Sequence, residues 1–284
     1  MKNESTDPCV ILCLAGLDPT GGAGLQADIE TVAALGGHAL PVATALTAQD
    51  TNDVKALIPI PAEDVLAQVR PLLADIAIDG IKIGLLGGLE TIGIVHDILV
   101  EHRGIPVVLD PVCRAGGGKD LVDDALTEAL VEDLLPHTTV LTPNRLELHR
   151  LAPNHPHERE GAKALLQRGC KSILITGADE DTPQVINRFH TGDKEPLSFG
   201  WERIEGVFHG SGCTLATAVA TYLAMGQTPL QAVECAQGFA HEAIARGYRI
   251  GSGQSIPNRR GLGKIRPRNR AFPRSLPPSI ESEP

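Results

Sequence analysis

Short apolar runs alternate with longer amphipathic stretches along most of this chain, and that alternation restricts the fold more than any other feature. The run at 9–15 has the length and composition of a buried strand. After it, Leu25, Ile29 and Val32 recur at the spacing of one helix face. Repeated strand–helix units of this kind predict an α/β fold, in which a central, mostly parallel sheet carries helices on both faces.

The remaining elements follow the same pattern. Further strands are expected at 41–46, 54–58, 80–83, 106–109, 139–141, 172–175 and, antiparallel, 185–189. Further helices are expected at 63–73, 92–100, 122–135, 158–168, 212–225 and 229–246. Segments rich in glycine, proline and polar residues follow strand ends at 16–24, 84–88, 110–119 and 142–147. Because ligands of parallel sheets bind beyond the carboxyl ends of the strands, these segments are the predicted location of a site.

The charge and the apolar composition exclude several classes of protein. The 284 residues carry a net charge of -10, which argues against a nucleic-acid-binding protein. No uninterrupted apolar stretch is long enough to span a membrane, and the polar first residues do not resemble a secretory signal. The six cysteines form no Cys-x-x-Cys pair, and we expect them to be reduced thiols of a cytoplasmic protein.

The end of the chain differs from the rest. Residues 259–284 carry a net charge of +5, whereas residues 1–258 carry -15. From residue 261 onward the chain is rich in proline and arginine and has no apolar period. We therefore expect a single domain over 1–258, followed by a flexible basic tail over 259–284 that catalysis does not need.

A glycine-rich loop, Gly21-Gly22-Ala23-Gly24, lies between the first strand and the first helix. Unbonded N–H groups and the positive end of the helix dipole suit an anion or a polar ligand there. The loop lacks the Lys-Ser/Thr of a P-loop, and Ala27 stands where a dinucleotide fingerprint requires a glycine. On the glycines alone, a ligand-binding loop and a tight strand–helix turn are equally good interpretations.

Two further strand ends carry polar residues. Asp110 closes the strand at 106–109, and Asn144 and Glu147 follow the strand at 139–141. The spacing of Asn144 and Glu147 is that of a capping box, which begins a helix without any ligand. The alternative is that these two residues and Asp110 organise Mg²⁺ on nucleotide phosphates, because Mg²⁺ keeps several waters and takes few direct carboxylates.

The strongest local signal is the segment Gly210-Ser211-Gly212-Cys213, which begins a long apolar helix. Successive N–H groups at such a helix start form a binding site for an anion. Cys213 falls in the first turn, where the helix dipole favours a thiolate. The alternative is an ordinary helix start with a small buried cysteine.

Taken together, these segments resemble the hydroxymethylpyrimidine/phosphomethylpyrimidine kinases of thiamine biosynthesis, a family of the ribokinase-like superfamily. The resemblance covers about residues 15–258, and its six motifs occur in order at compatible spacing. The motifs are AGLDPTGGAGLQAD at 15–28, TALTAQDT at 44–51, IKIGLL at 81–86, VLDPV at 108–112, LTPNRLE at 141–147 and GSGCTL at 210–215.

The resemblance implies a ribokinase-like fold and ATP-dependent, Mg²⁺-assisted phosphorylation of 4-amino-5-hydroxymethyl-2-methylpyrimidine, first to its monophosphate and then to the diphosphate. It implies that Gln49, Asp28, Gly16 and Leu85 line the pyrimidine pocket. The chemistry of Gln49 fits, since a carboxamide offers a donor and an acceptor side by side, which matches an aminopyrimidine edge.

The resemblance also assigns the phosphate chemistry. Asp110, Asn144 and Glu147 would organise Mg·ATP, with Asp110 and Glu147 acting on the metal indirectly. The N–H groups of Gly210, Ser211, Gly212 and Cys213 would hold the charge that builds on the transferred phosphoryl group. Cys213 would accept the proton of the substrate hydroxymethyl group.

The chain departs from the family pattern at three places. Ser211 stands where threonine is more common, and Leu85 where methionine is common. Thr176-Gly177-Ala178 replaces the Lys-Gly-Gly of many members, which bears on the second phosphorylation more than on the first. Two other functions compete: a pyridoxal kinase of the same superfamily, and a non-catalytic pyrimidine-binding regulatory module. A homodimer is compatible with the sequence.

Overall fold

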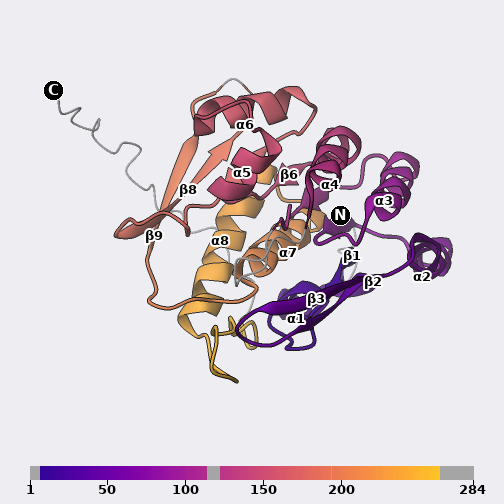
Figure 1. Cartoon of the computed structure of the whole chain (residues 1–284), viewed down its shortest axis with the longest axis horizontal. Helices are drawn as coiled ribbons and strands as arrows, with labels where there is room; N and C mark the ends of the chain where they lie inside the picture. The colour runs from indigo at the N-terminus through magenta and orange to yellow at the C-terminus, as the bar shows by residue number, and fades with distance from the viewer. Residues whose placement is uncertain (1–6, 114–121, 193, 263–284) are drawn as a thin grey trace, which may run out of the picture.

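In the part of the chain that the structure describes, nine strands form one sheet in the order β3-β2-β1-β4-β5-β6-β7-β8-β9 (Figure 1). The computed structural model describes residues 7–113, 122–192 and 194–262. The strands are β1 (Val10–Leu17), β2 (His38–Gln49), β3 (Val54–Pro59), β4 (Gly80–Ile83), β5 (Val107–Leu109), β6 (Val140–Leu141), β7 (Ile173–Ile175), β8 (Gln184–His190) and β9 (Leu197–Glu202). Strands β2, β1, β4, β5, β6 and β7 run parallel, whereas β3, β8 and β9 pair antiparallel. The predicted α/β fold with a mostly parallel sheet is confirmed.

Helices cover both faces of this sheet. One face packs against α1 (Gly24–Ala34), α7 (Ser211–Ala224) and α8 (Pro229–Ala245). The other packs against α2 (Ala62–Asp75), α3 (Leu89–Glu101), α4 (Asp124–Ala129), α5 (Arg145–Leu151) and α6 (Glu158–Gln167). Strand β1 therefore buries alternate side chains in two cores, Ile11 and Cys13 in one and Leu12 and Leu14 in the other. Within the described ranges, we find no helix with the length and apolar character that crossing a membrane requires.

One predicted helix changes form along its length, and one strand was missed. The helix expected at 122–135 is helical over residues 124–137, but α4 continues as a π-helical segment at Leu130–Leu134 and a 3-10 turn at Leu135–His137. Pro136 explains the change, because proline lacks an N–H and its ring clashes with the carbonyl four residues earlier in a helix. Strand β9 was missed altogether, since its side chains are half-buried or exposed and it has no buried apolar run.

The domain extends past its predicted boundary at residue 258. Arg259 is fully buried and Leu262 is only 6% exposed. The backbone N–H of Asn258 also donates to the carbonyl of Ala243 at the end of α8. The expectation that the tail begins at 259 is therefore wrong, because the first residues of that segment pack in the core. The rest of the predicted tail, 263–284, lies outside the described residues.

The topology brings distant segments to one edge of the sheet. Strand β1 lies between β2 and β4, so the chain turns away from β1 in opposite directions on its two sides. Such a reversal opens a crevice at the carboxyl ends of the strands. The ends of β1, β4, β5 and β6 lie side by side there, and α7 packs against β1, β4 and β5.

Candidate active site

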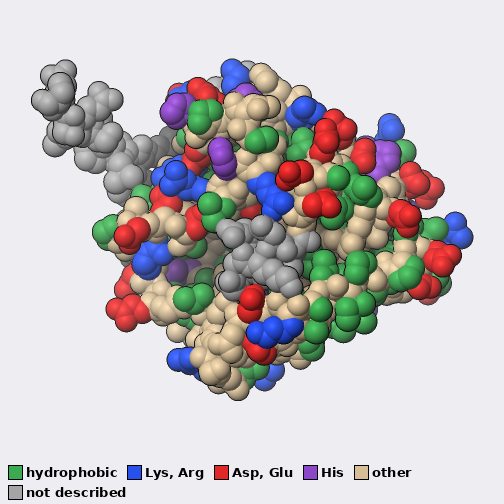
Figure 2. Space-filling model, in the orientation of Figure 1, with side chains coloured by type: hydrophobic (Ala, Val, Ile, Leu, Met, Phe, Trp, Pro, Cys, Tyr) green, Lys and Arg blue, Asp and Glu red, His purple; other side chains and the backbone are tan. Residues whose placement is uncertain are grey.

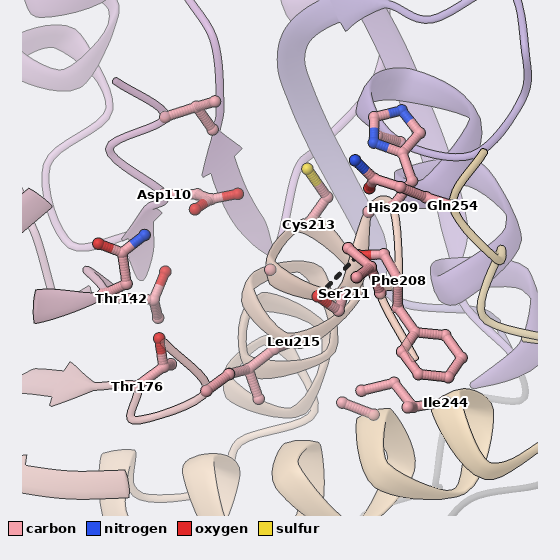
Figure 3. Close-up of a pocket in the computed structure, with 18 of the residues that line it drawn as sticks. Asp110, Thr142, Thr176, Phe208, His209, Ser211, Cys213, Leu215, Ile244 and Gln254 are labelled. Atoms are coloured by element: carbon pink, nitrogen blue, oxygen red, sulfur yellow. Dashed lines mark hydrogen bonds between the residues drawn. The ribbon is translucent and has the colours of Figure 1, made fainter. Parts of the chain in front are cut away.

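A cavity of about 550 Å³ lies at this edge of the sheet. All the predicted site residues except Asp28 line it: Gly16, Gln49, Leu85, Asp110, Asn144, Glu147, Gly210, Ser211, Gly212 and Cys213. Figure 3 shows Asp110, Thr142 and Thr176 on one side of the α7 N-terminus, with His209 and Gln254 on the other. One cavity thus brings together residues from six separate motifs.

Two glycine loops meet at the centre of the cavity. Gly210 precedes α7 in a left-handed conformation, with φ of 81°. A Cβ on Gly210 would lie 2.0 Å from the carbonyl oxygen of Gly22, so only glycine allows this approach. Within the described ranges, no side chain makes a capping hydrogen bond at the start of α7. The first N–H groups of a helix have no hydrogen-bond partner within the helix. In α7 the residues that carry them line the cavity, and such a helix start is suited to binding a phosphoryl group.

Asp18 and His209 join these two loops, and sequence reasoning missed both residues. The Asp18 carboxylate accepts hydrogen bonds from the N–H groups of Thr20, Gly22 and Ala23. His209 Nε2 lies 2.8 Å from Asp18 Oδ2. Burial alone would raise the pKa of Asp18, but the hydrogen bonds and charge of His209, together with Thr20, lower it. The Asp-x-Thr spacing at 18–20 was the available signal, since Asp commonly hydrogen-bonds the backbone two residues on.

Asp28 does not line the pocket, which corrects its predicted role in substrate binding. Its carboxylate is fully buried beneath the cavity floor and accepts a hydrogen bond of 2.5 Å from Thr217 on α7. Lys82 on β4, also fully buried, lies 3.0 Å from Asp28 Oδ1. Burial would lower the pKa of Lys82, but Asp28, Cys213 and Asp110 raise it above its usual range. Lys82 lines the cavity and is a further charged residue that sequence reasoning overlooked there.

Cys213 lies on the first turn of α7, as predicted, but its surroundings do not favour a thiolate. Burial, Asp110 and Asp28 outweigh Lys82 and raise the pKa of Cys213 to about 12. Burial and these two acids therefore disfavour the predicted thiolate in this form of the protein, in which Cys213 lies beside the Asp110 carboxyl group (Figure 3). A helix dipole is only a partial charge, and burial, reinforced by the two nearby acids, opposes it.

The acidic residues fit a magnesium-bound phosphate. Both interpretations of Asn144 hold together: it caps α5 in a capping box with Glu147, and it also lines the cavity. Burial, with a contribution from Asp110, raises the pKa of Glu147 to about 8. Asp110 Oδ2 is buried and has no hydrogen-bond partner among the described residues. A crowded pair of carboxyl groups with an unsatisfied oxygen suits a cation, although the described residues contain no cluster of three or more metal ligands.

The opposite end of the cavity presents the carboxamide of Gln49. The amide nitrogen of Gln49 donates to Thr47 Oγ1 at 2.8 Å, and Thr47 in turn donates to the carbonyl of Leu17 at 3.0 Å. These bonds fix the orientation of the carboxamide and leave its oxygen and one N–H for a ligand. Leu85 closes over Gly16, where a Cβ would lie 3.2 Å from the leucine side chain.

The segment that departs from the family pattern also lines the cavity. Thr176, which stands where many members have lysine, follows β7 and faces the cavity with Ala178. Gly177 is retained for a steric reason, because a Cβ there would lie 2.3 Å from the carbonyl oxygen of Ile186. Its N–H donates to Asn187 Oδ1 at 3.0 Å. The loop thus keeps its backbone path without the lysine.

Comparison with solved structures defines the class of protein. The pyridoxal kinase from Staphylococcus aureus, solved in complex with AMP-PCP and pyridoxal, has the same fold, with a TM-score of 0.81 and 27% sequence identity. The alignment covers 89% of this chain and 94% of that one. The fold is therefore that of the ribokinase-like kinases, as predicted.

Sequence comparison defines the family within that class. A family model described as phosphomethylpyrimidine kinase matches residues 18–258, and the chain belongs to this family. It is 36% identical over 252 residues to the hydroxymethylpyrimidine/phosphomethylpyrimidine kinase of Rhizobium meliloti, covering 86% of this chain and 94% of that protein. It is 34% identical over 252 residues to the thiamine biosynthesis bifunctional protein ThiED of Geobacter sulfurreducens, covering 87% of this chain but only 51% of that longer protein.

Proposed function

We propose that this protein transfers the γ-phosphoryl group of ATP to the hydroxymethyl group of 4-amino-5-hydroxymethyl-2-methylpyrimidine, and then phosphorylates the monophosphate to the diphosphate. One observation carries the proposal: a single cavity is lined by Gln49, by Cys213 and the start of α7, and by Asp110 and Glu147. A protein that only binds the pyrimidine does not need a carboxamide that recognises the ring, an anion site and a pair of carboxyl groups in one cavity.

The geometry supports specific roles along that cavity. Gln49 orients the pyrimidine so that its hydroxymethyl group points toward Cys213. The N–H groups from Gly210 to Cys213 hold the charge of the phosphoryl group during transfer, when it is most negative. These donors are held by a helix and two packed glycine loops, so little reorganisation is needed at the moment of reaction.

ATP and Mg²⁺ occupy the other end in this proposal. The residues that would hold the magnesium–phosphate unit are Asp110 and Glu147, acting through water, with Asn144 beside them. When bound, the metal neutralises charge on the phosphate oxygens. The unsatisfied oxygen of Asp110 supports this placement. Thr176 supplies no positive charge, so we expect the second phosphorylation to be slower than the first.

Product analysis tests the proposal directly. The protein is incubated with Mg·ATP and either the hydroxymethylpyrimidine or pyridoxal, and mass spectrometry reports which acceptor gains phosphate and how many phosphates it gains. We expect the pyrimidine monophosphate to form first and the diphosphate to follow. Hydrolysis of ATP with no phosphorylated acceptor would contradict the assignment, and preferential phosphorylation of pyridoxal would favour the competing kinase function.

Replacing Gln49 with leucine is expected to reduce the preference for the pyrimidine. The wild type should prefer the pyrimidine over pyridoxal by about tenfold or more in kcat/KM, since an unpaired buried carboxamide costs about 1–3 kcal/mol. Gln49→Leu removes the group that makes this distinction, so kcat/KM should fall more for the pyrimidine than for pyridoxal. Both acceptors are measured with both proteins.

The matched control is Gln167→Leu, which makes the same change at the exposed end of α6, outside the cavity. It should leave both specificity constants unchanged. If Gln49→Leu lowers kcat/KM equally for the two acceptors, Gln49 does not distinguish the pyrimidine ring from pyridoxal. The pyrimidine assignment would then lose its main physical support.

We also propose that a second copy of the chain covers a row of exposed apolar side chains on the neighbouring strands β1, β2 and β3. Leu17, Leu46 and Ile58 are 41%, 39% and 50% exposed and lie side by side on β1, β2 and β3. Figure 2 shows hydrophobic side chains gathered over β2 and β3. Exposed apolar patches of this kind mark interfaces, and a twofold dimer buries the same patch twice.

Light scattering after size exclusion tests the dimer. We expect a dimer for the wild type and a monomer for Leu46→Glu, because the substitution places a charge in the middle of the row. Leu46 does not line the cavity, so the residual activity of the variant can be measured separately. A wild-type protein that stays monomeric at micromolar concentration would refute the proposal.

The cytoplasm is the proposed location. The described ranges contain all six cysteines, and none of them is joined in a disulfide. Thiols persist in the reducing environment of the cytoplasm.

A further inference from the structure

We propose that Arg259 is a positioning residue for phosphoryl transfer: its guanidinium group holds the two glycine loops of the active site in fixed relation to each other. This inference rests on the proposed function, because it gives the start of α7 a role in binding the transferred phosphoryl group. Arg259 lies one residue beyond the match to the family model and was predicted to belong to the tail.

The guanidinium group uses its donors in three directions. Nη2 donates to the carbonyl oxygen of Gly22 in the first loop, at 2.6 Å, and approaches that of Gly210 in the second, at 3.5 Å. Nε donates to Thr214 Oγ1 at 2.8 Å, and the Thr214 hydroxyl donates onward to the Gly210 carbonyl at 2.7 Å. A single side chain therefore reaches both loops and the first turn of α7.

The charge of Arg259 is compensated within the domain. Its side chain has no exposed surface, and Nη1 donates to Glu30 Oε2 on α1 at 3.2 Å. A buried cation of this size is retained only where it is paired and hydrogen-bonded. All its acceptors are backbone or side-chain groups of the two loops and the helices α1 and α7, so the residue has a structural reason to connect them.

The carbonyl groups that Arg259 holds determine where the catalytic N–H groups point. In a trans peptide the carbonyl and the following N–H point in opposite directions. Fixing the Gly210 carbonyl toward Arg259 therefore fixes the Ser211 N–H on the opposite side of that peptide plane. The same reasoning applies to Gly22 and the N–H of Ala23, which donates to Asp18. Arg259 does not line the cavity, so any effect on catalysis must pass through these loops.

A lysine side chain at position 259 cannot make this set of hydrogen bonds. The guanidinium group is a planar fork whose donors reach several acceptors in fixed geometry, whereas an ammonium group is a single point of charge on a flexible stem. Arg259→Lys keeps the positive charge near Glu30 but cannot hold Gly22 and Thr214 at once. The variant therefore separates the positioning role from the charge.

The experiment compares Arg259→Lys and Arg259→Met with the control Arg260→Met. Arg260 is the neighbouring residue and lies 3.5 Å from the same Glu30, but its side chain is 75% exposed and makes no hydrogen bond to either loop among the described residues. We expect Arg259→Lys to lower kcat by roughly 10- to 100-fold, because small displacements of catalytic groups cost up to about this much. KM for both substrates should change by less than about threefold. Arg260→Met should behave as wild type.

A second measurement reports on the anion site without turnover. ADP with Mg²⁺ and aluminium fluoride mimics the transferred phosphoryl group, so its affinity depends on the loops, whereas the affinity of ADP alone does not. We expect Arg259→Lys to weaken the aluminium fluoride complex by about tenfold or more and to leave ADP binding unchanged. If Arg259→Met does not fold, the lysine variant alone decides the question.

Two results would overturn the inference. One is an Arg259→Lys protein that keeps more than half of the wild-type kcat and normal aluminium fluoride binding. The other is a loss of ADP affinity, KM and melting temperature together, which would make Arg259 a general brace of the fold. Failure of the proposed substrate is distinguishable, because the aluminium fluoride measurement needs no acceptor and the kinetic assay can use whichever acceptor the wild type phosphorylates.

Discussion

Replacing Cys213 with alanine is expected to lower kcat by about 10²- to 10⁴-fold while the protein remains folded, the range over which a positioned proton-transfer group contributes. Cys213 lines the cavity on the first turn of α7 and lies between Asp110 and His209 in Figure 3. Alanine is a good helix former and leaves the backbone N–H groups of α7 in place, so the loss should be confined to turnover. Steady-state kinetics and thermal unfolding of the variant check both parts.

Two further variants make this result specific. Cys9→Ala, which removes a half-buried cysteine outside the cavity, should leave kcat unchanged. Cys213→Ser keeps a hydrogen-bonding group of similar size but raises the pKa of the side chain far above that of a thiol. If Cys213 ionises when substrate is bound and then accepts the proton, serine should be nearly as inactive as alanine. A Cys213→Ala protein that retains more than half of the wild-type kcat would remove the residue from the mechanism while leaving the anion site intact.

Replacing Lys82 with methionine is expected to lower the free energy of unfolding by about 3–5 kcal/mol, which is typical when one partner of a buried ion pair is removed. Lys82 and Asp28 are both fully buried, and the remaining Asp28 would keep only Thr217 as a hydrogen-bond partner. The double variant Lys82→Met/Asp28→Asn should recover part of the loss, because it no longer buries an uncompensated charge. Denaturant unfolding of the wild type and the variants measures these differences.

The control for Lys82 is Lys55→Met. Lys55 pairs with Asp50 at 3.5 Å, but its side chain is 60% exposed, so the substitution should change stability little. If Lys82→Met is as stable as the wild type, the pair under the active site does not hold the structure together, and Asp28 would again be a candidate for contact with substrate. A stable Lys82→Met protein with low activity would instead place the role of Lys82 in catalysis.

Most of the candidate site could be predicted because its signals are local. The glycines before α7, the strand-end Asp110 and the Asn144–Glu147 capping box each lie within one short segment. In a parallel sheet the carboxyl ends of neighbouring strands meet at one edge, so identifying those ends was enough to place their residues in a common cavity. Gln49 was assigned through the family resemblance, and β2 proved to run on to that residue.

The errors arose where the role of a residue depended on distant partners. Asp28 lies one turn into α1, and nothing nearby in the sequence indicates that Lys82 and Thr217 enclose it. The Cys213 thiol was judged by its helix position, whereas its pKa depends on burial and on Asp110 and Asp28 from other elements. Arg259 was counted with a basic tail because arginine is usually exposed, yet its acceptors are already in place on the two glycine loops.

The sequence by itself determined the alternation of strands and helices, the glycine-rich turns and the set of chemical groups at the strand ends. These follow from periodicity and from conformational limits that act within a few residues. Only the tertiary structure decided which of those groups face the cavity, which are buried beneath it and which hold the loops in place. Arg259 and Gly22, which are 237 residues apart in the chain, form a hydrogen bond only in the folded protein. Burial and charge at such contacts depend on how the whole chain packs, and no local pattern specifies them.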